Sequence, residues 1–363
     1  YLGDEKFAKE ILDYTIKITK ENGGMPPMYN TGCILPKLMF GQIEAGFRDK
    51  EEIKKYIDAL MKMKVHGGWL NLQYSHKINP DTGKEYEPET EETVKTIVAL
   101  LKANRTLDDD VVREALKTNR KLLMTEQYKK EQYVDWVIGA CWSLLFYKKI
   151  GIRDLDAYRK ARAEVIEFML TDPRIDNREG VGDPYMVGLA MLAAQGAIPE
   201  SSPPYNHSLE MLIKGYDKNT GAFKGIGKVF YNEKFWESST HSMIPLLALM
   251  RTGYGSKLID LDVQQPKNCG LKLIDVQENE SSFNIYVDAD VSEAYIEYTY
   301  DNFRNIEIDK MNKEDGRFVY SIRKEMLRKI WGKEIMEEFK EVPFQIIIKC
   351  PDYYWTSFWY EGV

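Results

Sequence analysis

The chain has 363 residues, of which 44% are hydrophobic, 12% aromatic and 29% charged. This length exceeds what one hydrophobic core usually supports, so we expect two or three folding units and exclude both a single small module and a disordered polymer. The 57 acidic residues outnumber the 50 basic ones and give a net charge of −7, without a basic block interleaved with aromatic residues, which argues against nucleic acid as a partner.

The sequence predicts no membrane span. Its longest apolar runs, at 243–250 and 187–194, are far shorter than the roughly 20 residues that cross a bilayer. The sequence begins at Tyr1 rather than Met, which fits a processed secreted protein and equally an excised domain. We expect a secreted or cell-surface protein, with a cytoplasmic one as the alternative.

Through about residue 257 the apolar residues recur with helical spacing, and the predicted helices come in pairs. In each pair the first helix is outer and amphipathic, and the second is inner and apolar on more than one face. The pairs are 7–20 with 31–46, 50–65 with 91–103, 109–125 with 132–147, 155–170 with 184–194, and 208–216 with 238–250. The inner helices recur every ~40–60 residues, as in stacked helical hairpins. Because they are apolar nearly all round, we expect the hairpins to close into a ring, an α/α toroid.

Three features of the helical region resemble the repeats of α/α toroids of the squalene-hopene cyclase and prenyltransferase class. They are the turns Gly23-Gly24-Met25 and Gly67-Gly68-Trp69, the period of the paired helices, and the threonine-rich starts of the inner helices. The resemblance covers about residues 1–257 and implies the fold. The acid motif D-x-D-D of those cyclases is missing, and we interpret Asp108-Asp109-Asp110 as a helix cap.

From Gln264 onward the period changes from 3.6 to 2. Short β-branched or aromatic runs at 271–276, 283–287, 294–300, 318–322 and 344–350 predict an Ig-like β-sandwich over 268–363, interrupted by one helix at 327–339. The polar segment 258–267 predicts a linker between this domain and the toroid domain at 1–257. Cys269 and Cys350 either pair across the sandwich in an oxidising environment or remain buried free thiols.

In a ring of hairpins the N-termini of all inner helices gather at one mouth, where carboxylates and aromatic side chains can converge. The residues at the inner-helix starts include Tyr86 and Glu89. Of the residues in this set, we expect Asp135, Asp183, Glu237 and His241 to be catalytic. Residues expected to contact substrate, either there or in the long loop after Gly67, are Tyr29, Asn30, Trp69, Tyr74, Glu91, Tyr133, Trp136, Tyr185 and Trp236.

Each candidate also has a structural interpretation. Asp183, Glu91 and Glu237 stand where an acid caps a helix, and His241 could be a core histidine. Asp135 least resembles a cap, because the apolar run Trp136-Val137-Ile138 follows it directly. On a nearly all-apolar helix a carboxylate needs a buried partner or an open pocket.

Aromatic faces stack on sugar rings, and paired carboxylates supply the acid and base of glycosidic cleavage. The sequence therefore predicts a carbohydrate-active enzyme, with hydrolysis ahead of lyase chemistry because no Arg or Lys stands at the inner-helix starts to neutralise a uronate. The alternatives are a non-catalytic toroid that binds a ligand or a protein, and an isoprenoid cyclase-like enzyme. We expect a carbohydrate partner and neither cofactor nor metal, since C-x-x-C and H-E-x-x-H spacings do not occur, and we assign no oligomeric state.

Overall fold

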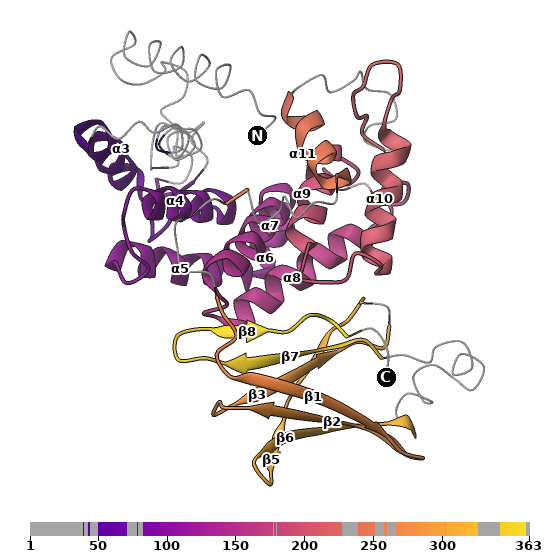
Figure 1. The fold of residues 1–363 in the computed structure, drawn as a ribbon. Helices are drawn as coiled ribbons and strands as arrows, with labels where there is room; N and C mark the ends of the chain where they lie inside the picture. The colour runs from indigo at the N-terminus through magenta and orange to yellow at the C-terminus, as the bar shows by residue number, and fades with distance from the viewer. Residues whose placement is uncertain are drawn as a thin grey trace. The chain divides into compact units, whose positions relative to one another are not determined.

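In a computed structural model, helices up to residue 249 are followed by β-strands from residue 271 (Figure 1). The structure describes residues 39, 43, 50–70, 78, 83–176, 178, 180–226, 239–250, 258–259, 261, 266–301, 303–325 and 342–360. These residues fall into two compact units. The first lies within Tyr1–Phe146 and Ile259–Asp262, and the second within Tyr147–Leu258 and Val263–Val363. The prediction of a helical region followed by a β domain is confirmed.

Except for the short α6, the described helices of the first unit fall in segments that the sequence predicts as helices. The described helices are α3 (Lys50–Met63), α4 (Thr90–Lys102), α5 (Asp110–Leu123), the short α6 (Glu126–Glu131), and α7 (Tyr133–Ile150), whose last turn belongs to the second unit. On α5 only one face is buried, whereas α4 is buried along nearly its whole length. Asp109 caps α5, because its carboxylate accepts a hydrogen bond from the Val111 backbone N–H at 3.0 Å, which confirms the cap interpretation.

A glycine sets how closely α7 approaches the start of α4. A Cβ atom added at Gly139 would lie 2.5 Å from the Cβ of Thr90, so a larger residue at position 139 would push the two helices apart. Below this contact, Ser143 of α7 and Asn119 of α5 are hydrogen-bonded at 3.1 Å inside the core. The first turn of α4 and the second turn of α7 therefore pack closely against each other.

In the second unit, α9 is the central helix. The helices are α8 (Leu155–Leu170), α9 (Pro184–Ala194), α10 (Pro203–Gly215) and α11 (Ser239–Leu249). All residues of α9 except Tyr185 are buried, and α9 packs against α8, α10 and α11. Four of the five predicted pairs thus have helices in both positions, while the first pair lies almost wholly outside the described residues. Helix α10 begins at Pro203, earlier than predicted, because proline is well suited to the first turn.

In the β domain the described residues form two four-stranded antiparallel sheets. Their strand orders are β1-β2-β6-β5 and β4-β3-β7-β8. The bounds are β1 (Leu271–Glu278), β2 (Ser282–Ala289), β3 (Ala294–Tyr298), β4 (Glu307–Lys310), β5 (Asn312–Glu314), β6 (Arg317–Arg323), β7 (Phe344–Lys349) and β8 (Tyr354–Thr356). Burial alternates along β2, and Ile285 and Val287 share one hydrophobic cluster with Ile296 and Ile346 of the other sheet. The predicted helix at 327–339 lies outside the described residues.

Cys269 and Cys350 form a disulfide that joins the segment just before β1 to the residue that follows β7. Their Cα atoms are 5.8 Å apart, and 81 positions separate them in sequence. Of the two arrangements that the sequence allowed, the structure has the paired one. Cys141 is a buried free cysteine.

A buried ion-pair cluster attaches α8 to the β domain within the second unit. The Glu297 carboxylate on β3 accepts hydrogen bonds at 2.6 Å from the Arg162 guanidinium and at 2.6 Å from the Gln345 amide. The Arg159 guanidinium lies 3.2 Å from the same carboxylate. The change from helix to strand falls at the predicted linker, yet one compact unit contains both α8–α11 and the strands. Separate folding of 1–257 and 268–363 stays a prediction.

Within the part of the chain that the structure describes, every helix is too short or too polar to cross a bilayer. This agrees with the absence of a long apolar run in the sequence.

Candidate functional site

A pocket of about 580 Å³ opens in the first unit, where the starts of α4 and α7 approach the end of α5 and the short helix α6. It is lined by Leu70, Tyr86, Glu87, Glu89, Lys121, Leu122, Thr125, Gln127, Tyr128, Glu131, Gln132 and Asp135. Three of these residues, Tyr86, Glu89 and Asp135, are among those that the sequence placed at inner-helix starts. The structure therefore brings the starts of the second and third predicted inner helices to one cavity.

Glu89 occupies the N-cap position of α4 but does not act as its cap. Its side chain makes no capping hydrogen bond, although its backbone carbonyl accepts the first helical hydrogen bond, from the Thr93 N–H at 3.0 Å. The side chain instead lines the pocket. A capping role, the structural alternative for acids at helix starts, thus does not account for this half-buried carboxylate.

Asp135 lies in the first turn of α7 and is half-buried in the pocket wall. The next residue, Trp136, points into the core with 0% of its surface exposed, and the Lys129 ammonium lies 4.9 Å from its ring centroid. Packing of the tryptophan fixes this end of the helix, so the Asp135 carboxylate is presented from a rigid element rather than from a loop.

Tyr128 of α6 lines the same pocket as the two carboxylates. Its hydroxyl accepts a hydrogen bond from the Thr90 backbone N–H at 3.4 Å, one residue beyond Glu89. Burial raises the pKa of Tyr128 well above its usual value, and the negative charges of Glu89 and Asp135 raise it further. The side chain is therefore a neutral phenol at physiological pH, close enough to both carboxylates to sense their charges.

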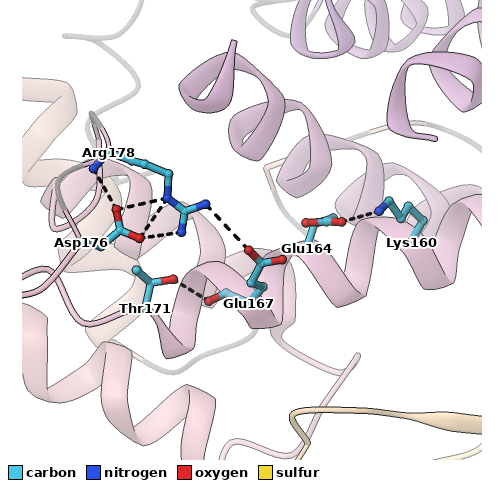
Figure 2. Close-up of polar contacts among 6 residues, drawn as sticks. All are labelled: Lys160, Glu164, Glu167, Thr171, Asp176 and Arg178. Atoms are coloured by element: carbon cyan, nitrogen blue, oxygen red, sulfur yellow. Dashed lines mark hydrogen bonds and ion pairs between the residues drawn. The ribbon is translucent and has the colours of Figure 1, made fainter. Parts of the chain in front are cut away.

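Asp183, by contrast, is a helix cap. Its carboxylate accepts a hydrogen bond from the Tyr185 backbone N–H at 2.8 Å at the start of α9. The loop before it is anchored to α8: the Arg178 guanidinium binds Asp176 at 2.7 Å and approaches Glu167 at 3.8 Å, as Figure 2 shows. Asp183 and Tyr185 belong to the second unit and do not line the pocket.

Other expected site residues lie in the core or in local ion pairs. Trp69 has 0% of its surface exposed, and its indole N–H donates to the Leu60 carbonyl at 2.8 Å, so it packs inside rather than at a mouth. Trp136 is likewise buried, which differs from the expectation of substrate contact. Glu91 pairs with Lys95 one turn along α4. Tyr133 is half-buried at the start of α7 but is not among the pocket residues.

The remaining candidates cannot be placed in this site. Tyr29, Asn30, Tyr74, Trp236 and Glu237 lie outside the described residues, and for His241 only its position in α11 is described.

The sequence analysis missed Tyr128, Glu87 and Glu131. Helix α6 has six residues, none of them buried, so it lacks the apolar period from which the other helices were predicted. A detectable signal was a tyrosine within the polar segment EQYKKE, shortly before the largely apolar helix α7.

Among the described residues, no group of three or more His, Cys, Asp or Glu side chains is arranged to hold a metal ion. No protein-family model matches the chain, and comparison with curated protein sequences found no significant match.

Proposed function

We propose that this protein is a glycoside hydrolase that cleaves an oligo- or polysaccharide in the pocket of the first unit, with Glu89 and Asp135 as its acid–base pair. The observation that carries the proposal is that two half-buried carboxylates, from the starts of two different helices, line one pocket together with a half-buried phenol, Tyr128, whose pKa their charges raise. One carboxyl group would protonate the leaving oxygen, and the other would act as base or nucleophile.

The composition of the pocket favours a sugar over an apolar ligand. Of its twelve lining residues two are leucines and none is a methionine, whereas carboxylates, amides, a threonine hydroxyl and two tyrosines make up most of the rest. Such groups hydrogen-bond sugar hydroxyls, and tyrosine rings can stack on the C–H faces of the sugar. An isoprenoid substrate would need a pocket lined mostly by apolar side chains.

The state of Tyr128 favours hydrolysis over elimination. A tyrosine that removes a proton in a lyase must ionise readily, which requires cations that lower its pKa. Burial and two carboxylates raise the pKa of Tyr128 instead. Tyr128 therefore serves as a hydrogen-bonding group for the carboxylates or the sugar rather than as a base.

A repeated turn supports the toroid that we propose for the helical region. Isolated β-bridges join Ile78 to Glu85 before α4 and Tyr216 to Phe223 before α11. Both eight-residue segments, INPDTGKE and YDKNTGAF, carry Thr-Gly at the same two positions, and the glycines have φ angles of +67° and +71°. Equivalent turns between outer and inner helices are expected of repeated hairpins.

We also propose that the β domain is an Ig-like sandwich and that the protein is secreted or at the cell surface. Two antiparallel sheets around one core are compatible with an Ig-like sandwich. A disulfide persists in oxidising compartments, so the Cys269–Cys350 bond supports a secreted or cell-surface location.

The test compares Asp135→Asn and Glu89→Gln with Asp183→Asn on a broad panel of oligosaccharides, following the release of reducing ends. Loss of either pocket carboxylate should lower the rate by about 100-fold or more. The asparagine at position 183 can still cap α9 and should leave the rate unchanged. Chemical denaturation of each variant should show a change in the free energy of unfolding of at most about 1 kcal/mol.

Full activity in Asp135→Asn would remove the proposed acid–base pair. Products with a ring double bond would indicate a lyase, and saturable binding without cleavage across the panel would indicate a non-catalytic binding protein.

A further inference from the structure

The charge of the pocket lining is strongly one-sided. Four carboxylates, those of Glu87, Glu89, Glu131 and Asp135, face it, against the single ammonium group of Lys121. The carboxyl groups of the lining thus outnumber its ammonium group by three. A concave surface lined by one sign of charge concentrates ligands of the opposite sign.

Two of these carboxylates exceed what glycosidic cleavage requires, since that reaction uses one acid and one base or nucleophile. Glu89 and Asp135 are half-buried, whereas Glu87 and Glu131 are exposed at the rim. The Gln127 amide donates a hydrogen bond to the Glu131 carboxylate at 2.6 Å and holds it on the pocket side of α6. The rim pair is therefore placed to select what enters rather than to react.

Among the residues that line the pocket, Lys121 is the one cation, and it is exposed. A glycan with carboxylate or sulfate groups would bring like charges to this lining, whereas a glycan with ammonium groups would balance it.

We propose that the glycan bound in this pocket carries free amino groups, as an oligosaccharide of unacetylated hexosamine does, with Glu87 and Glu131 facing its ammonium groups. This inference rests on the proposed function, because it names the substrate class of the same site. The ligand has the chemistry that matches the excess charge, and its hydroxyl groups match the amides and the tyrosines.

The experiment measures binding of three hexasaccharides by calorimetry at mildly acidic pH, where sugar amines are protonated: β-1,4-linked glucosamine, its fully N-acetylated counterpart and α-1,4-linked galacturonate. The first two have the same backbone and linkage and differ in the charge of the amino group. The glucosamine hexamer should bind at least about tenfold more tightly than the acetylated one, and added salt should reduce the difference. The galacturonate hexamer should not bind.

The variant Glu87→Gln/Glu131→Gln tests the rim directly. Each exposed charge contact contributes up to about fivefold in affinity, so the double variant should lose roughly tenfold for the glucosamine hexamer and little for a neutral glycan. Glu126→Gln, an exposed change on the same helix outside the lining, is the matched control and should bind as the unchanged protein does.

Equal or tighter binding of the acetylated hexamer, binding of galacturonate, or no binding of glucosamine would each overturn the inference. Cleavage of a neutral glycan with no response to glucosamine would leave the hydrolase proposal intact. Tight, rim-dependent binding of glucosamine without cleavage would support the inference and remove the hydrolase proposal.

Discussion

Replacing Glu297 by glutamine should destabilise the second unit by about 3 kcal/mol or more. Glu297 has 0% of its side chain exposed and Arg162 has 2%, so both charges are removed from water and depend on each other. Removing one partner of a buried pair leaves the other charge uncompensated, which typically costs ~3–5 kcal/mol. The glutamine keeps the size of the side chain, so the loss comes from charge and hydrogen bonding rather than from a cavity.

The magnitude follows from three contacts to one carboxylate. Arg162 and Gln345 each donate to it at 2.6 Å, and Arg159 lies 3.2 Å away. Hydrogen bonds to a charged group contribute about 1.5–3 kcal/mol each, and the glutamine retains part of them. The expected loss is a large fraction of the ~5–15 kcal/mol that stabilises a typical domain.

The assay is denaturant unfolding of the full chain, with Glu307→Gln on the neighbouring strand β4 as an exposed control that should change stability by less than about 0.5 kcal/mol. The double variant Glu297→Leu/Arg162→Met removes both charges and should lose less stability than Glu297→Gln. A change below about 1 kcal/mol in Glu297→Gln, or a double variant less stable than the single one, would refute the reasoning.

Substitutions at an aspartate, two glycines and a glutamate have defined outcomes in the same unfolding measurement. Asp183→Ala should cost about 1 kcal/mol because it removes the cap of α9, while Asp183→Asn should be nearly neutral. Gly182→Ala should cost about 3 kcal/mol or more, since the φ of Gly182 is +87° and the new Cβ would lie 1.7 Å from a carbonyl oxygen. Gly221 has a similar φ of +71°, but no atom lies within 4 Å of the new Cβ, so Gly221→Ala should cost about 1 kcal/mol. Hydrogen bonds from one tyrosine and two lysines lower the pKa of Glu293 to about 2. Its contribution is complete above the unfolded-state pKa of roughly 4.3 and is lost as the pH falls toward 2, so the stability difference between the unchanged protein and Glu293→Gln should shrink over that range.

Helices with a strong apolar pattern were the elements best predicted from sequence. The segments that became α7 and α9 are apolar on every face, and a helix with that pattern must be buried. Strands β2 and β6 were equally clear, because their runs are short, alternate with period 2 and end in turn residues. The short strands β4, β5 and β8 have mixed or exposed patterns and were not predicted.

The site was predicted in part, because sequence position indicates which end of a helix a residue occupies but not where its side chain points. The cost of burying a carboxylate predicted either a buried partner or an open pocket for Asp135, and the structure has it in a pocket wall. Trp69 follows two glycines, and we predicted that it lies in a loop over the mouth. In the structure its indole N–H donates to the Leu60 carbonyl, and the ring is buried. The sequence could not predict a role for Tyr128, because the hydroxyl group contacts Thr90, which is 38 positions away in the chain.

The disulfide also determines how the β domain would respond to mechanical force. Tension applied at the two ends of the chain would pass through the sulfur atoms, bypassing the 81-position interval between Cys269 and Cys350. An extended chain spans at most about 3.4 Å per residue, so this interval would withhold roughly 280 Å of extension until the bond is reduced. The helices outside the disulfide loop could therefore be extended while most of the β domain stays inside the closed loop. Reduction of the disulfide would then release the length of this loop in a single step.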